Sequence, residues 1–228
     1  MVALTTRPTK RATRRRSTLV HRMARTPRRS TPPRLVVIGG LIGTGKSTLA
    51  RQLAKALGAV WLRTDEIRLR EFGHLPRPRR RFAEGRYAPQ ISALVYQRLI
   101  RRATTLIKRG RSVVCDGTFS KHEGREALRR AAARYGASFY FFECVVPRAV
   151  ALRRVAARYA AGTDFSEAQP EHYDRLRVAF EPIQGWPSSC WRRLSTSRAP
   201  ETTAQVALKL LRPRHRARAA SRGPVGCA

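Results

Sequence analysis

Residues 35–48 read LVVIGGLIGTGKST, and this stretch decides the fold. Its first residues, Leu35–Ile38, form a short continuous apolar run, as expected for a strand that is covered on both faces. The glycines that follow let the backbone curve tightly around a bound group. Beyond Lys46, apolar residues recur at helical spacing until Gly58, which stands where a C-terminal cap glycine belongs. The glycine-rich loop therefore joins a strand to a helix.

This loop matches the pattern G-x-x-x-x-G-K-[ST], which begins at Gly40 and ends at Ser47. In that pattern the backbone N–H groups wrap a phosphate, and the positive end of the helix dipole faces the same anion. Lys46 then reaches the β and γ phosphates, and the Ser47 hydroxyl holds magnesium. We therefore expect ATP and Mg²⁺ as cofactors. The predicted cofactor-binding residues are Gly40, Leu41, Ile42, Gly43, Thr44, Gly45, Lys46, Ser47 and Thr48.

Further apolar runs predict more strands, and helical patterns separate them. The runs lie at 59–62, 112–115, 138–144 and 191–196, and the main helical patterns lie at 91–107, 128–135, 147–158 and 201–211. Such alternation implies a doubly wound parallel sheet with right-handed crossovers, whose ligands bind at the carboxyl ends of the strands. The predicted fold class is therefore α/β, a three-layer P-loop NTPase with a parallel five-stranded sheet.

Two carboxylates stand at carboxyl ends of predicted strands. Asp116 follows the run 112–115, where it could contribute to a magnesium site beside Ser47 or merely cap a loop or helix. Asp65 follows the run 59–62, where it could accept the proton of an attacking hydroxyl. Alternatively, Thr64 or Asp65 could cap the next helix. The predicted metal ligands are Ser47 and Asp116, and Asp65 is a candidate catalytic base.

Arginines gather on the helical stretch after the fourth predicted strand, at Arg153, Arg154 and Arg158. Arg154 and Arg158 share one helix face by their i, i+4 spacing. Such a pair could close over a triphosphate and stabilise the charge of phosphoryl transfer, although in an arginine-rich chain they could also be surface residues. The predicted catalytic residues are Lys46, Asp65, Arg154 and Arg158.

The positive charge is densest at the two ends of the chain, although more than half of it lies between them. There are 48 lysines and arginines against 14 aspartates and glutamates, a net charge of +34, and no acid lies in 1–33 or 212–228. These two segments are poor in large apolar residues, so we predict disordered tails around one domain at 34–211. Such tails are usually solvated, or they bind nucleic acid through its phosphates. Residues 74–86, with Arg77 to Arg81, resemble an exposed loop that could also grip an acidic substrate.

Composition also argues against several classes of protein. No apolar run approaches the ~18–20 residues that span a bilayer, and no secretory signal is evident, so no membrane partner is expected. The 4 cysteines lack zinc-site spacing and suggest a reducing, cytoplasmic setting. The arginine-rich start resembles a transit peptide, but Pro32, Pro33 and earlier prolines interrupt any long helix. Met23 is an alternative start to Met1.

Several segments together resemble one family. They read GGLIGTGKSTLA (39–50), LRTDEIR (62–68), YAPQISALVYQRLI (87–100), GRSVVCDGTF (110–119), FECVVPRAVALRRVAAR (142–158), DFSEA (164–168) and EPI (181–183). From about Leu35 to Leu211, the chain resembles P-loop kinase-like proteins that are usually labelled AAA family ATPases. Some of these occur fused to aminoglycoside-phosphotransferase-like domains. The chain departs from them in its arginine-rich 77–81 insert and in Ser195, where members often carry an acid.

The resemblance implies a sheet of the nucleotide-kinase type with a small helical lid at about 150–172. By position, Asp65 and Asp116 match the acids after the second and third strands, and Arg154 and Arg158 match arginines of the lid. We therefore expect an ATP-dependent kinase that moves the γ-phosphate to a hydroxyl of a small-molecule acceptor. The alternatives are a nucleic-acid 5′-hydroxyl kinase that uses the basic tails, and a regulatory ATPase without an acceptor. The oligomeric state stays open.

Overall fold

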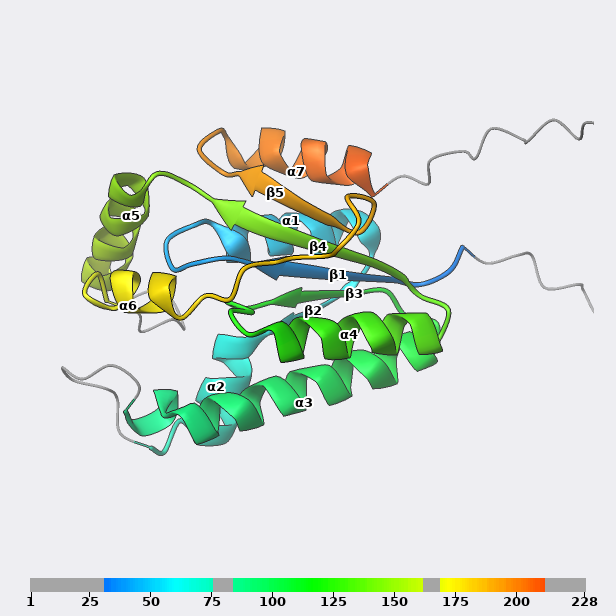
Figure 1. Cartoon of the computed structure of the whole chain (residues 1–228), viewed down its shortest axis with the longest axis horizontal. Helices are drawn as coiled ribbons and strands as arrows, with labels where there is room; N and C mark the ends of the chain where they lie inside the picture. Colours follow the sequence, from blue (N-terminus) through cyan, green and yellow to red (C-terminus); the bar gives the residue numbers. More distant parts are fainter. Residues whose placement is uncertain (1–30, 76–83, 162–168, 212–228) are drawn as a thin grey trace, which may run out of the picture. The chain divides into compact units, whose positions relative to one another are not determined.

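The computed structural model describes residues 31–75, 84–161 and 169–211, and within them strands and helices alternate (Figure 1). The strands are β1 (Arg34–Gly39), β2 (Val60–Arg63), β3 (Val113–Asp116), β4 (Ser138–Val145) and β5 (Trp191–Ser195). All neighbouring strands are parallel, in the order β2-β3-β1-β4-β5, so the glycine-rich loop follows the central strand. The predicted α/β fold with a parallel five-stranded sheet is confirmed.

The helices cover the sheet and its carboxyl end. They are α1 (Lys46–Leu57), α2 (Thr64–Phe72), α3 (Pro89–Lys108), α4 (His122–Arg134), α5 (Arg148–Ala161), α6 (His172–Val178) and α7 (Pro200–Leu210), with a 3-10 turn η1 (Gly85–Tyr87). The lid expected at about 150–172 falls on α5, on residues 162–168 outside the described part, and on the start of α6. No helix in the described ranges is both long and apolar enough to cross a bilayer.

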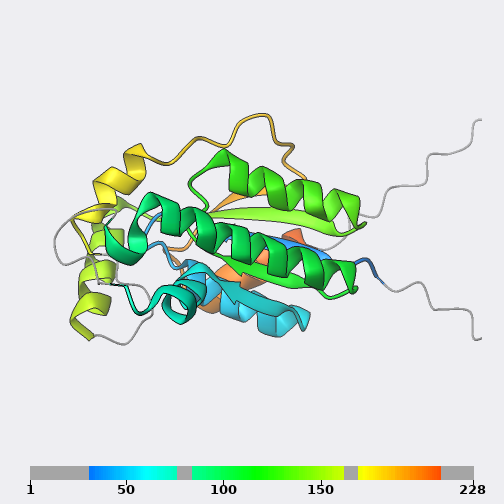
Figure 2. The same cartoon turned by 90° about the horizontal axis from the view of Figure 1, so that it is seen from below.

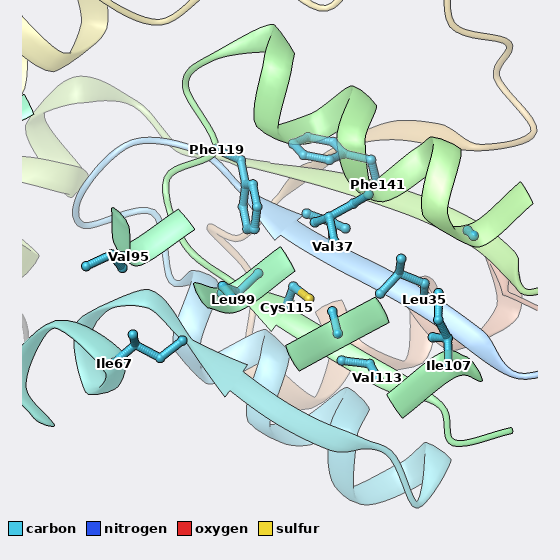
Figure 3. Packing of buried hydrophobic residues seen from close by; sticks show 13 residues of the cluster. Leu35, Val37, Ile67, Val95, Leu99, Ile107, Val113, Cys115, Phe119 and Phe141 are labelled. Atoms are coloured by element: carbon cyan, nitrogen blue, oxygen red, sulfur yellow. The ribbon is translucent and has the colours of Figure 1, made fainter. Parts of the chain in front are cut away.

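Both faces of the sheet are buried, and alternate residues of β1 serve opposite faces. Leu35 and Val37 pack in the cluster that includes α3 and α4, as Figure 3 shows, and Figure 2 shows these helices lying across the sheet. Val36 and Ile38 pack with α1 and α7 on the other face. Successive side chains of a strand point to opposite faces, so a continuous apolar run is what a doubly covered strand requires.

The interval between α2 and α3 is only partly the exposed loop that the sequence predicted. Residues 76–83, which contain Arg77 to Arg81, lie outside the described residues. Arg86, however, is buried in η1, and its carbonyl oxygen accepts a hydrogen bond of 2.6 Å from Arg68 Nη1. The prediction of exposure was therefore wrong for Arg86, because a buried arginine on α2 fixes the end of this interval to α2.

A second buried arginine ties the loop after β3 to the segment after α6. Arg125 on α4 is 0% exposed. Its Nη1 donates to the carbonyl oxygens of Phe119 (2.9 Å) and Ser120 (3.1 Å), and its Nη2 donates to those of Glu181 (3.0 Å) and Pro182 (3.4 Å). The Glu181 carboxylate in turn accepts hydrogen bonds at the start of α4, from the backbone N–H of His122 and from Lys121 Nζ. We call these contacts the Arg125 clasp.

We expect Arg125→Leu to lower the free energy of unfolding by about 2–5 kcal/mol, because backbone carbonyls in a buried site lose their charged donor. Urea denaturation with an unchanged m-value measures the difference. The matched control is Arg129→Leu on the same helix, which removes only a partly exposed ion pair of 2.7 Å to Glu126 and should cost less than about 1 kcal/mol. Equal losses of unfolding free energy in the two variants would contradict a stabilising role of the Arg125 clasp.

Candidate active site

The glycine-rich loop between β1 and α1 requires glycine where the backbone meets its neighbours. Gly40 and Gly43 have φ of 127° and 73°. A Cβ at Gly40 would lie 2.4 Å from the carbonyl oxygen of Cys144, and one at Gly43 would lie 2.3 Å from that of Ala151. Ile42, between them, is buried in a cluster that includes residues of α5 and α6. The loop is therefore seated firmly between the end of β4 and the first turns of α5.

The loop presents hydrogen-bond donors and a cation. In the part of the chain that the structure describes, the amides of Gly43 and Gly45 donate no hydrogen bond. Lys46 Nζ donates to the carbonyl oxygen of Leu41 at 2.7 Å, as does Thr44 Oγ1. Burial lowers the pKa of Lys46, while attraction to Asp116 opposes this shift. Unused amides and a desolvated ammonium are what an anion would satisfy.

Ser47 and Asp116, the two predicted metal ligands, are brought together. Asp116 is paired in register with Ile38 of β1 and Arg63 of β2, and the Ser47 side chain is close enough to lower the pKa of its carboxyl. Asp116 is 3% exposed, and burial raises its pKa to about 6, although Lys46, Ser47 and Arg63 favour the ionised form. The Arg63 guanidinium lies 3.7 Å from the carboxylate. One hydroxyl and one carboxylate fit a Mg²⁺ ion whose other ligands are phosphates and water.

The loop after β3 is held in place beside the glycine-rich loop. The amide of Gly40 donates to the carbonyl oxygen of Thr118 at 3.1 Å, and the amide of Gly117 donates to that of Ile38 at 3.3 Å. Phe119 has φ of 49°, and its amide donates to the Tyr96 hydroxyl at 2.8 Å. Burial raises the pKa of Tyr96 to about 12, so the phenol stays neutral. These contacts fix the backbone that carries Asp116.

Asp65 lies in the first turn of α2, close to this cluster. The prediction that Thr64 or Asp65 caps the helix was wrong: the N-cap is Arg63, with no side-chain cap hydrogen bond, because β2 runs directly into the helix. The half-buried Asp65 carboxylate makes no hydrogen bond or ion pair with any residue that the structure describes. Its charge raises the pKa values of Lys46 and Asp116, so it lies within electrostatic reach of both.

Two of the three α5 arginines that the sequence singled out, Arg154 and Arg158, lie near the glycine-rich loop. Arg154 Nη2 donates to the carbonyl oxygen of Thr196 at 3.0 Å, and its Nη1 lies 3.6 Å from where a Cβ of Gly45 would be. The charge of Arg158 lowers the pKa of Lys46, so the two cations lie within electrostatic reach of each other. Arg153 is exposed. Arg154 and Arg158 therefore lie on one face of α5, as their spacing predicted, and their part in catalysis stays a prediction.

Thr196 contacts the glycine-rich loop, and the sequence did not reveal this contact. It follows β5, is 7% exposed, and its Oγ1 donates to the carbonyl oxygen of Thr44 at 2.6 Å. The sequence drew attention to the neighbouring Ser195, which is exposed. The only available indication was position, since Thr196 stands at the carboxyl end of a predicted parallel strand.

The remaining predicted residues lie in three places. Thr48 is half-buried in the first turn of α1, next to Ser47. The segment 164–168, which the family resemblance included, lies outside the described residues, as do the tails 1–30 and 212–228.

A cavity of about 250 Å³ adjoins the glycine-rich loop between Leu41, the end of β4 and the segment after α6, but Asp65 does not line it.

Comparison with known proteins agrees with this geometry. The AAA domain family model matches residues 35–183. Uncharacterized proteins of Mycobacterium tuberculosis and Mycobacterium bovis are 38% identical over 113 residues, which are 49% of this chain but 23% of those proteins. Among solved structures, a sugar kinase from a Janibacter species has a TM-score of 0.60 at 20% identity, covering 79% of this chain and 95% of that one. The Mycobacterium tuberculosis APS kinase in complex with AMPPNP and APS has a TM-score of 0.54 at 23% identity, covering 79% and 98%. The chain therefore belongs to the AAA domain family, and its fold is that of the P-loop kinases.

Proposed function

We propose that the protein is an ATP-dependent phosphotransferase that moves the γ-phosphate of ATP to a hydroxyl of a small-molecule acceptor. The observation that carries this proposal is the half-buried Asp65 carboxylate, which has no hydrogen bond or ion pair with the described residues and lies within electrostatic reach of Lys46 and Asp116. A carboxylate that makes no internal contact in this position is suited to act on the acceptor hydroxyl. A protein that only binds nucleotide has no need of it.

Bound ATP and Mg²⁺ would supply the transferable phosphoryl group and part of its charge neutralisation. The amides of Gly43 and Gly45 would donate to phosphate oxygens, and Ser47 and Asp116 would hold the metal. Lys46 would exchange the carbonyl oxygen of Leu41 for a phosphate oxygen. Because burial disfavours the charged form of Lys46, an anion beside it would restore the favourable environment of the ammonium.

Asp65 would accept the proton of the acceptor hydroxyl as that oxygen approaches the γ-phosphate. Arg154 and Arg158 would stabilise the charge that spreads over the transferred group. These two side chains come from α5, so a movement of α5 toward the bound phosphates would complete the site and exclude water. Exclusion of water favours transfer to an acceptor over hydrolysis.

The acceptor is proposed to be a small molecule, as the names of two solved kinases of this fold, a sugar kinase and an APS kinase, suggest. The test is incubation with γ-labelled ATP, a metabolite extract and a pool of oligonucleotides with free 5′ hydroxyls. We expect a labelled small molecule that forms only with Mg²⁺ present, and none with a Lys46→Ala preparation.

Two other results would contradict the proposal. Label at the 5′ end of the oligonucleotides would identify a nucleic-acid kinase. Release of labelled phosphate alone, with no labelled product from any fraction of the extract, would identify an ATPase. Any protein of this charge retains nucleic acid at low salt, so transfer of label and not binding decides between these outcomes.

A further inference from the structure

We propose that Thr196 is a positioning residue of the glycine-rich loop. It holds the peptide between Thr44 and Gly45 in the orientation that presents the Gly45 amide to a phosphate, and it aligns Arg154 beside that amide. This inference rests on the proposed function, since it assigns the residue a part in nucleotide binding.

Three hydrogen bonds converge on Thr196. Its amide donates to the carbonyl oxygen of Val145 at 3.1 Å, which continues the pairing of β5 with β4. Its Oγ1 donates to the carbonyl oxygen of Thr44 at 2.6 Å, and its own carbonyl oxygen accepts a hydrogen bond of 3.0 Å from Arg154 Nη2. Thr196 is therefore fixed to the sheet and in turn fixes one loop peptide and one arginine.

The hydrogen bond from Thr196 Oγ1 to the Thr44 carbonyl also sets the direction of the Gly45 amide. In a planar trans peptide the C=O and the N–H point in opposite directions, and the described residues contain no cis peptide. Because the carbonyl of Thr44 points to Thr196 Oγ1, the amide of Gly45 points away from Thr196. That amide donates to no group among residues 31–75, 84–161 and 169–211, so it is available to a ligand.

The peptide needs such a restraint because of the residue that follows it. Gly45 has φ of 78°, and a Cβ there would meet nothing closer than 3.5 Å, the distance to Thr196 Oγ1. Packing alone therefore does not confine this glycine, unlike Gly40 and Gly43. A glycine also rotates its flanking peptide at little steric expense. The hydroxyl of Thr196 selects one orientation of the peptide before any ligand arrives, which is preorganisation.

The bond to Arg154 extends the same restraint to α5. The carbonyl of Thr196 holds this guanidinium near Gly45, where it would meet the same phosphate as the Gly45 amide. A polar group that is held in place before the ligand binds loses less conformational entropy on binding. Thr196 thus sets the relative position of two phosphate donors that come from distant parts of the chain.

The test compares Thr196→Val, which keeps the shape and removes the hydroxyl, with Thr196→Ser, which keeps the hydroxyl. The probe is ADP with Mg²⁺, titrated calorimetrically into the full-length protein. We expect the valine variant to bind about five- to thirtyfold more weakly, as for a lost preorganising hydrogen bond. The serine variant should stay within about twofold of the wild type.

Thr203→Val is the matched control for a merely structural effect. Thr203, at the start of α7, is 5% exposed, and its Oγ1 donates to the carbonyl oxygen of Ala199 at 3.2 Å. Thr203→Val therefore removes a buried hydroxyl and one hydrogen bond to a carbonyl, as Thr196→Val does. This variant should unfold at a lower temperature, as Thr196→Val should, yet bind Mg-ADP like the wild type.

Each other outcome overturns the inference. Wild-type affinity in Thr196→Val would overturn it and leave the proposed function standing. An equal loss of affinity in Thr203→Val would show that the effect follows from general destabilisation. If the wild-type protein bound no Mg-ADP, the proposed function would fail, and this inference would fail with it.

Discussion

Lys46→Ala should bind Mg-ATP at least about a hundredfold more weakly than the wild type, because truncation of a buried charged partner typically removes that much binding free energy. A second effect adds to the first. The charge of Lys46 lowers the pKa of Asp116, which burial holds at about 6, so removal of the ammonium raises that pKa further. More of the Asp116 carboxyl is then protonated at pH 7, and a protonated carboxyl is a poor ligand for Mg²⁺. Phosphate transfer should fall below detection.

The fold should survive this substitution. The carbonyl oxygen of Leu41 that accepts from Lys46 also accepts from Thr44 Oγ1, at 2.7 Å in both cases, so it keeps a donor. Calorimetric titration measures affinity, and circular dichroism checks the fold. The matched control is Lys55→Ala, an exposed lysine in the last turn of α1, which should bind Mg-ATP normally. Unchanged affinity in Lys46→Ala would remove the nucleotide site from this loop.

Asp65→Asn should lower phosphate transfer by about 10²–10⁴-fold while leaving Mg-ATP affinity nearly unchanged, which is the usual effect of losing a positioned general base. The substitution is nearly isosteric. The carboxylate makes no hydrogen bond or ion pair with the described part of the chain, so no internal contact is broken. Single-turnover transfer to the identified acceptor, at saturating Mg-ATP, measures the effect.

Glu66→Gln is the control for Asp65. Glu66 is the next residue on α2 and forms an exposed ion pair of 2.8 Å with Arg70, so its loss should change transfer by less than about twofold. A loss smaller than about tenfold in Asp65→Asn, roughly 1.4 kcal/mol in barrier height, would remove Asp65 from the catalytic residues. The proposed function would then need another base.

The sheet could be predicted because strands that are buried on both faces have a recognisable sequence pattern. Runs such as Leu35–Ile38 and Val113–Cys115 are continuous and apolar, and each ends at a glycine or a carboxylate. Short elements leave no such mark: α6 and η1 are too brief for a helical period to appear. The predicted start of α2 was one or two residues late, because no loop residue separates this helix from β2.

The site could be predicted only where its residues lie in a local motif or at the carboxyl end of a predicted strand. Ser47 and Asp116 stand at strand ends that a parallel sheet must bring together, so topology predicts their proximity. The contact of Thr196 with Thr44 joins residues that are 152 positions apart, and no local sequence pattern around either residue predicts it. The burial of Arg125 could not be predicted for another reason. In a chain so rich in arginine, the sequence does not distinguish a buried guanidinium from an exposed one.

The Arg125 clasp also sets an order of events during synthesis. A ribosome makes Arg125 56 residues before Glu181 and 57 before Pro182, so half of the acceptors for this guanidinium do not yet exist when α4 emerges. Until they arrive, α4 cannot bury that side chain without leaving a charge partly unsatisfied. The loop after β3 shares the clasp through Phe119 and Ser120, so its contacts with Arg125 form before the clasp is complete. A nascent chain that stops directly after α5 contains every proposed catalytic residue but lacks Glu181 and Pro182, so the clasp is still incomplete.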